Sequence, residues 1–227
     1  MTDREKAVRG TRGIARRLGG ALIASLLAFA PLAGQMPITV VAGVTSSNWS
    51  FSSGASAGQH ALTGPVVGIA TTLPLGSRFG FSPEILYVAR GASLLFGGNV
   101  QIDFRVHYVA VPLLLRYTEG TVRSIRPFIE LGPVVSVVAA CSTKATNSAS
   151  NGGTVIVEPC TTGYADITQD QPDAIDFGLA AGVGASEGRF SVSVRFDDGV
   201  SDIFSRYRTS GGSTRNTAWT GMVAVRL

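Results

Sequence analysis

Apolar and polar side chains alternate with a period of two along most of the chain after residue 35, and no segment there shows the 3.6-residue period of an amphipathic helix. In 189–197, for example, Phe190, Val192 and Val194 share one face of an extended chain, whereas Arg195 lies on the other. Clusters of glycine, serine, threonine and asparagine bound these segments, as is usual between strands. The pattern predicts an all-β fold.

Eight segments with this alternation are expected to form strands, and the connections between them alternate in length. In an up-and-down sheet, odd-numbered and even-numbered connections emerge at opposite ends, and short turns at one end with large loops at the other are typical of bacterial outer-membrane barrels. The expected strands are 38–46, 63–73, 79–92, 102–117, 126–139, 174–186, 189–198 and 216–227. The odd-numbered connections, mostly long and polar, are 47–62, 93–101, 140–173 and 199–215, and the short ones are 74–78, 118–125 and 187–188.

Alternation alone does not say which face of the sheet points inward. In a soluble, lipocalin-like cup the apolar face would fill the interior, whereas in a membrane barrel it would face lipid. The asymmetric loops and an export signal favour the membrane barrel, in which closure gives every strand its backbone partners. We therefore expect an all-β, eight-stranded antiparallel up-and-down transmembrane barrel. Its lipid-facing residues should include Phe177, Leu179, Phe190, Val192, Val194 and Phe196.

The export signal lies at the N-terminus. A basic region that ends in two arginines precedes a short apolar run, and small residues follow, which is the pattern of a secretory signal peptide. A membrane-spanning helix is the alternative, but a proline interrupts the apolar run and about 20 apolar residues are needed to span a bilayer. We expect a cleaved signal peptide at 1–34 and a barrel domain at 35–227.

The net charge of +4 comes from this N-terminal segment. Six of the 19 basic and two of the 15 acidic residues lie in 1–34, which leaves 13 of each sign in the remainder. A neutral body gives no electrostatic support to a nucleic-acid partner, so we expect none.

The polar faces of the expected strands carry charges that would point into the barrel. An arginine facing lipid at mid-depth would cost about 2–4 kcal/mol, so opposite charges should pair inside and fill the lumen. Glycines on the inward face of 176–184 would leave room for these side chains, and their spacing does not match a phosphate-binding loop. We interpret the charges as a structural ion-pair plug, with a proton or ion path as the alternative. The set is Glu84, Arg90, Arg116, Glu130, Asp176, Arg195 and Arg226.

The only two cysteines, Cys141 and Cys160, lie in the longest expected loop. An exported chain meets an oxidising compartment, where the two can pair, and two cysteines alone do not make a zinc site. We expect a disulfide, which would remove about 3 kcal/mol of chain entropy from the open loop.

No residue pattern indicates a catalytic, cofactor or metal site, so we expect none of these. An acyl-transfer site needs a nucleophile beside a base, and the only histidines, His60 and His107, are not part of a recognisable triad. A lipid-modifying or proteolytic enzyme is therefore the least favoured function.

Four segments resemble the PorT-like family of outer-membrane β-barrel proteins: FSPEILYVARGA (81–92), YVAVPLLLRY (108–117), RPFIELGPVVSV (126–137) and DFGLAAGVGASEGRFSVSVRF (176–196). Their order and spacing follow the family over most of residues 63–199. The resemblance implies a structural or secretion-associated role in the outer membrane of a Gram-negative-type bacterium. We expect a non-enzymatic, monomeric scaffold, surrounded by outer-membrane lipid, whose external loops contact surface or secretion proteins. A small transport or ligand-binding barrel is the alternative.

Overall fold

The computed structural model describes residues 37–52, 59–96, 99–121, 123–147, 154–160, 172–204 and 213–227. These residues form ten strands of one antiparallel sheet. In this part of the chain, no helix is long and apolar enough to cross a membrane. The expected signal peptide, 1–34, lies outside the described residues, so it and the domain boundary that follows it remain predictions.

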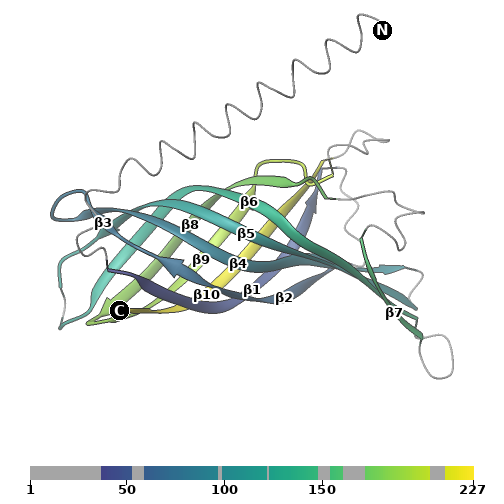
Figure 1. The fold of residues 1–227 in the computed structure, drawn as a ribbon, viewed down its shortest axis with the longest axis horizontal. Helices are drawn as coiled ribbons and strands as arrows, with labels where there is room; N and C mark the ends of the chain where they lie inside the picture. Colours follow the sequence, from purple (N-terminus) through teal and green to yellow (C-terminus); the bar gives the residue numbers. More distant parts are fainter. Residues whose placement is uncertain are drawn as a thin grey trace, which may run out of the picture. The chain divides into compact units, whose positions relative to one another are not determined.

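Eight of the ten described strands close into a barrel (Figure 1). Neighbours along the chain are paired, and β1 pairs with β10 to close the ring, so the strands supply one another's backbone partners as a bilayer requires. The short β3 pairs with β4, and β7 pairs with β6 outside the ring. The strands are β1 (Thr39–Phe51), β2 (Gln59–Ala70), β3 (Leu73–Pro74), β4 (Phe79–Phe96), β5 (Val100–Thr118), β6 (Arg126–Asn147), β7 (Thr154–Pro159), β8 (Ile175–Glu187), β9 (Phe190–Gly199) and β10 (Thr214–Arg226).

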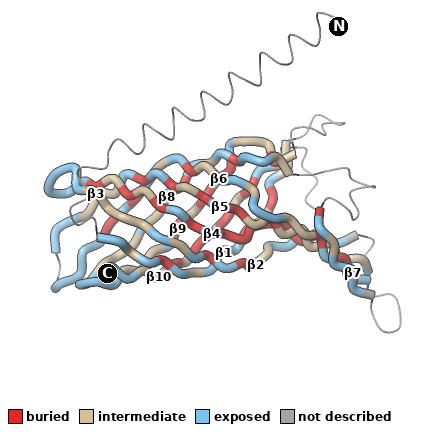
Figure 2. The backbone as a smooth tube through the Cα atoms, in the orientation of Figure 1, coloured by how far each residue is buried: buried red, intermediate tan, exposed pale blue. Residues whose placement is uncertain are grey.

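Burial alternates along the strands of the barrel (Figure 2). Many of the exposed side chains are large and apolar. Val183, Val192 and Val223 are 60%, 56% and 57% exposed. Soluble monomers rarely expose large apolar patches, so a lipocalin-like cup would turn these residues inward. These exposed apolar residues of the barrel wall, called the apolar belt below, confirm the transmembrane barrel. Of the lipid-facing residues expected, Phe177, Leu179, Phe190, Val192 and Val194 are exposed, and Phe196 is half-buried against Trp219.

All eight expected strands are present, but several extend further than the alternation indicated. β1 ends at Phe51 rather than residue 46, β4 at Phe96 rather than 92, and β6 at Asn147 rather than 139. The added segments include serine, threonine and asparagine, which hide the two-residue period, whereas ladder hydrogen bonds need only the backbone. Large parts of the first, third and fifth expected loops are therefore strand, and the prediction of those parts as loops was wrong.

The two ends of the barrel differ. The short-turn end carries the connections 71–78, 119–125 and 188–189, together with Pro37 and Leu227. At the opposite end, called the long-loop end, lie the strand ends Phe51, Phe96, Asn147 and Gly199. There the ends of β4, β5 and β6 run on past the ring, with β7 beside β6 (Figure 1).

Candidate functional site

The middle of the barrel holds a cluster of charged side chains around Arg195, on β9. The Arg195 guanidinium donates one hydrogen bond to each carboxylate oxygen of Glu84, both at 2.8 Å. It donates two more to Glu130 Oε1, at 3.1 Å from Nε and 2.7 Å from Nη2. Arg116 Nη2 donates to the other oxygen of Glu130 at 2.9 Å. These four residues, called the ion cluster below, thus balance two carboxylates with two guanidiniums through charge-assisted hydrogen bonds, the strong kind.

The register of the sheet brings the ion cluster together. Arg116 lies opposite Glu130, Glu130 lies opposite Gly182, and Gly182 lies opposite Arg195, so three members of the ion cluster share one cross-strand row with Gly182, and Arg195 reaches the fourth, Glu84, from β4. A Cβ atom at Gly182 would lie 3.1 Å from both Cγ and Oε1 of Glu130. The glycine therefore leaves the space through which Arg195 reaches Glu130 across β8.

A second glycine makes room for the ring beneath Arg116. A Cβ atom at Gly184 would lie 2.3 Å from Cζ of Phe128. The Arg116 guanidinium carbon is 4.1 Å from the centroid of that ring, a cation–π contact that contributes roughly 0.5–2 kcal/mol. The inward glycines of β8 therefore provide interior space, as their phase predicts.

Asp176 and Arg90 belong to a second polar layer, closer to the long-loop end. Asp176 accepts hydrogen bonds from Asn216 Nδ2 at 2.9 Å and from the Ser201 hydroxyl at 2.6 Å. Arg90 Nη2 lies 3.4 Å from Asp197 Oδ2, and both side chains are 8% exposed. The expected interior network therefore divides into two layers at different depths.

Three members of this second layer are not among the predicted interior residues: Asp197, Tyr108 and Asn216. Asp197 has the same phase as Arg195 on β9, and the buried Tyr108 has the same phase as Arg116 on β5. The Tyr108 hydroxyl accepts a hydrogen bond from Asn216 at 3.1 Å. Phase alone would have identified all three as inward-facing, although it would not have identified their partners.

Arg226 faces the lumen, as its phase predicts, but it lies outside both polar layers. Its position on β10 points toward the lumen, but the strand has reached the short-turn end by this residue and the side chain is exposed. Its Nη2 donates to the carbonyl of Gly188 at 3.0 Å. Alternation predicts the face of a strand and not the depth, which is why the sequence did not separate this arginine from the two layers.

Apolar side chains close the interior at the long-loop end. Trp49, Ala92 and Ile203 are buried there, and Phe104 and Phe204 pack on Trp49 with ring centroids 5.3 and 5.2 Å away. Besides the two polar layers, the described interior holds this apolar cluster and a second one that includes Leu86, Ala110 and Leu114, and it opens into a cavity at the other end.

A cavity of about 380 Å³ opens at the short-turn end. Its lining reaches Glu84, Arg116 and Arg195 of the ion cluster, and serine and threonine hydroxyls lie along its walls. Four further arginines line it nearer the mouth: Arg78, Arg126, Arg189 and Arg226.

One of these arginines has a compensating acid. Arg78 Nη1 donates to the hydroxyl of Tyr117 at 3.2 Å and lies 3.8 Å from Glu119. The amide of Gly120 and then the Tyr117 hydroxyl hold the pKa of Glu119 below its usual range, so this carboxylate is ionised at neutral pH. The Tyr117 hydroxyl is also the main cause of a raised pKa for Arg78.

The described residues hold no group of three or more His, Cys, Asp or Glu side chains placed to bind a metal ion. His107 is on the outer surface of β5, where its Nδ1 is 2.6 Å from the Tyr87 hydroxyl and the two rings stack. His60 is exposed at the start of β2. The two histidines therefore lie on the outside of the barrel wall and away from the polar interior.

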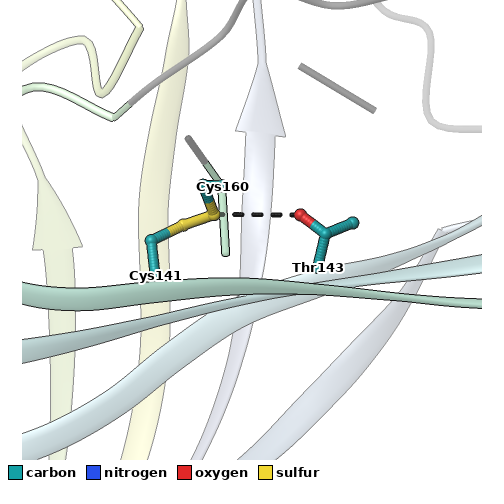
Figure 3. Close-up of a disulfide and its surroundings, with 3 residues drawn as sticks. All are labelled: Cys141, Thr143 and Cys160. Atoms are coloured by element: carbon teal, nitrogen blue, oxygen red, sulfur yellow. Dashed lines mark hydrogen bonds between the residues drawn. A yellow bond between two sulfur atoms is a disulfide. The ribbon is translucent and has the colours of Figure 1, made fainter. Parts of the chain in front are cut away.

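Cys141 and Cys160 form a disulfide, as predicted (Figure 3). It joins β6 to the residue that follows β7, with Cα atoms 5.4 Å apart, and the Thr143 hydroxyl lies 3.8 Å from Cys160 Sγ. The bond ties β7 to the part of β6 that extends beyond the ring.

Residues 33–205 match the family described as outer membrane protein beta-barrel domain. The chain belongs to this family. As an outer-membrane barrel, it lies in the outer membrane with its apolar belt in lipid. Short turns of such barrels lie in the periplasm, so the short-turn end faces the periplasm and the long-loop end faces outward.

No curated protein matches the sequence of this chain. Several solved outer-membrane barrels are similar to it. Neisserial surface protein A is 13% identical over 84% of this chain and 97% of its own, with a TM-score of 0.45. OprG from Pseudomonas aeruginosa is 13% identical over 85% and 96%, with a TM-score of 0.41. The outer-membrane enzyme PagL is 12% identical over 82% and 99%, also with a TM-score of 0.41.

We expect this outer-membrane barrel not to conduct, even when the ion cluster is broken. Glu130→Ala removes the carboxylate shared by Arg116 and Arg195, but it leaves the apolar cluster around Trp49 in place. The variant should be less stable than the wild type and show the same absence of single-channel conductance in planar bilayers. A clear rise in conductance would show that the ion cluster, rather than the apolar cluster, closes the lumen.

Proposed function

We propose that the protein is a non-enzymatic scaffold of the outer membrane that holds a stiff β-sheet outside the cell as a contact surface for another protein. The observation that carries this proposal is the extension of β6 beyond the barrel. β6 pairs with β8 only as far as Val137, and residues 138–147 continue for roughly 30 Å at the usual rise per residue.

This extension is a sheet with partners on both sides of β6. Residues 140–147 pair with 100–107 of β5, and 142–147 pair with β7. We call β7 with these parts of β5 and β6 the extended sheet. The disulfide lies beside the pairing of Ser142 with Pro159, so it fixes one end of β7. A sheet held in this way loses little conformational entropy on binding, which favours affinity.

The extended sheet exposes apolar side chains on the aqueous side of the membrane. Val155, Ile156 and Val157 are 55%, 40% and 64% exposed. In the barrel wall such residues face lipid, but β7 lies outside the ring, where apolar patches mark interaction sites. Val155 and Val157 lie on one face of β7 and Ile156 lies on the other, so the face with the two valines is the one that suits a protein partner.

The resemblance to PorT-like proteins supports one specific form of this proposal, in which the partner belongs to a secretion machine. The family that residues 33–205 match is broader, so this form rests on the four resembling segments alone.

The surroundings of His107 support the absence of catalysis. Its described hydrogen-bond partner is the Tyr87 hydroxyl, and no described carboxylate is bonded to the ring to orient it as a base. An acyl-transfer site needs both a nucleophile and an oriented base.

Photo-crosslinking in cells tests the proposal. A photoreactive amino acid at Val157 should give a discrete crosslinked protein product, whereas the same residue at Val223, in the lipid-facing belt, should not. The Cys141→Ser/Cys160→Ser variant should weaken the product and leave the barrel folded. Absence of any protein product from Val155, Ile156 or Val157, or lipid hydrolysis by the purified barrel, would contradict the proposal.

A further inference from the structure

The cavity at the short-turn end is lined by far more positive than negative charge. Six arginines line it, against one carboxylate, Glu84. Two of the six, Arg195 and Arg116, are held by Glu84 and Glu130, and Arg78 is compensated by Glu119. The remaining three are Arg126, Arg189 and Arg226.

These three arginines have no carboxylate within 4 Å among the described residues. Arg226 donates one hydrogen bond to the carbonyl of Gly188, which carries no charge. Glu187, the acidic residue nearest to Arg189 in the sequence, is not part of the lining and accepts a hydrogen bond from Ser124. The mouth of the cavity therefore holds three arginines that form no ion pair within the described residues.

The placement of two of the three follows from the pattern that builds the barrel. Arg126 has the same phase on β6 as the buried Phe128 and Glu130, and Arg226 has the same phase on β10 as the buried Met222. Both residues line the cavity for this reason.

We propose that this cavity binds an oxyanion, a phosphate or carboxylate group that approaches from the periplasmic side. Guanidinium groups present several donors in a planar fork that suits both kinds of oxyanion. A recess whose lining carries an excess of one sign of charge, here six arginines against one carboxylate, concentrates counter-ions. The lining also includes the hydroxyls of Ser191 and Ser193 and the apolar side chains of Val41 and Met222.

The size and closure of the cavity define the ligand further. A volume of about 380 Å³ lies within the range of small-molecule sites. The ion cluster and the apolar cluster around Trp49 close the interior beyond it, so the ligand binds and leaves by the same mouth. The site is independent of the extended sheet, which lies at the opposite end of the barrel.

Titration of the folded, full-length protein in an uncharged detergent tests the site. Inorganic phosphate and succinate, added separately at low salt, should give saturable amide shifts by NMR for residues of the cavity lining. The Arg126→Gln/Arg226→Gln variant should bind at least about tenfold more weakly, because each loses a charge-assisted donor. Arg215→Gln removes the same charge at the long-loop end, where Arg215 is exposed, and should leave affinity unchanged.

A second variant tests the space rather than the charge. Ala224 lines the cavity, and Ala224→Phe should obstruct it without changing any charge. Folding of every variant is checked by its shift on unheated gels. The lipid arm uses nanodiscs with and without phosphatidylglycerol: shifts that only the anionic lipid produces would assign the oxyanion to a headgroup. No saturable shift with any of the three probes, or an equal loss of binding in Arg215→Gln, would overturn the proposal.

Discussion

Replacing Arg195 with alanine is expected to lower the free energy of unfolding of the barrel by about 3–5 kcal/mol. The guanidinium makes four hydrogen bonds to Glu84 and Glu130, whose side chains are only 4% and 1% exposed. Without it, two like charges remain buried near each other, and only Arg116 is left to pair with one of them. Urea unfolding of the barrel in lipid vesicles, followed by tryptophan fluorescence and by the gel shift, measures the change.

Two controls separate buried charge from lost packing. Arg215→Ala removes an exposed arginine from β10 and should change stability by no more than about 0.5 kcal/mol. The double variant Glu84→Gln/Arg195→Met removes one charge of each sign, leaves Glu130 paired with Arg116, and should recover most of the loss, because buried ion pairs are often replaceable by neutral side chains. If the double variant is as unstable as Arg195→Ala, packing rather than charge explains the effect.

The composition of the ion cluster was predictable because the side-chain period of a strand is two. Once the apolar face of each strand is assigned to lipid, Glu84, Arg116, Glu130 and Arg195 must point inward. Their grouping depends on register, which pairs Arg116, Glu130, Gly182 and Arg195 in one row. Register follows from turn geometry and pairing between distant segments, and a single sequence does not reveal it.

Depth and strand length were harder to predict, for related reasons. Arg226 and Met222 have the same phase, yet one is exposed at the mouth and the other is buried. β7 was assigned to a loop because its six residues, TVIVEP, stand alone among polar segments. It becomes a strand only because β6 continues past the ring and offers it an edge to pair with.

Replacing Val183 with arginine is expected to destabilise the barrel by about 2–4 kcal/mol, the cost of a cationic side chain at mid-depth in the bilayer. Val183 is 60% exposed and lies between Ile129 of β6 and Val194 of β9, both also exposed and apolar. In a protein whose belt faced water, the same change would be nearly neutral. Unfolding in vesicles, with the same two readouts, measures the difference.

The same substitution at Val157 is the matched control, because that valine is 64% exposed but belongs to β7, outside the ring. There the new guanidinium would meet water, so the change in stability should stay within about 0.5 kcal/mol. The comparison locates the boundary of the lipid belt along β6 and its neighbours. If Val183→Arg and Val157→Arg destabilise the barrel equally, β7 lies within the bilayer. If neither variant changes the stability, the apolar belt around Val183 does not face lipid. Either result would contradict an orientation in which the belt lies in the bilayer and the extended sheet lies outside it.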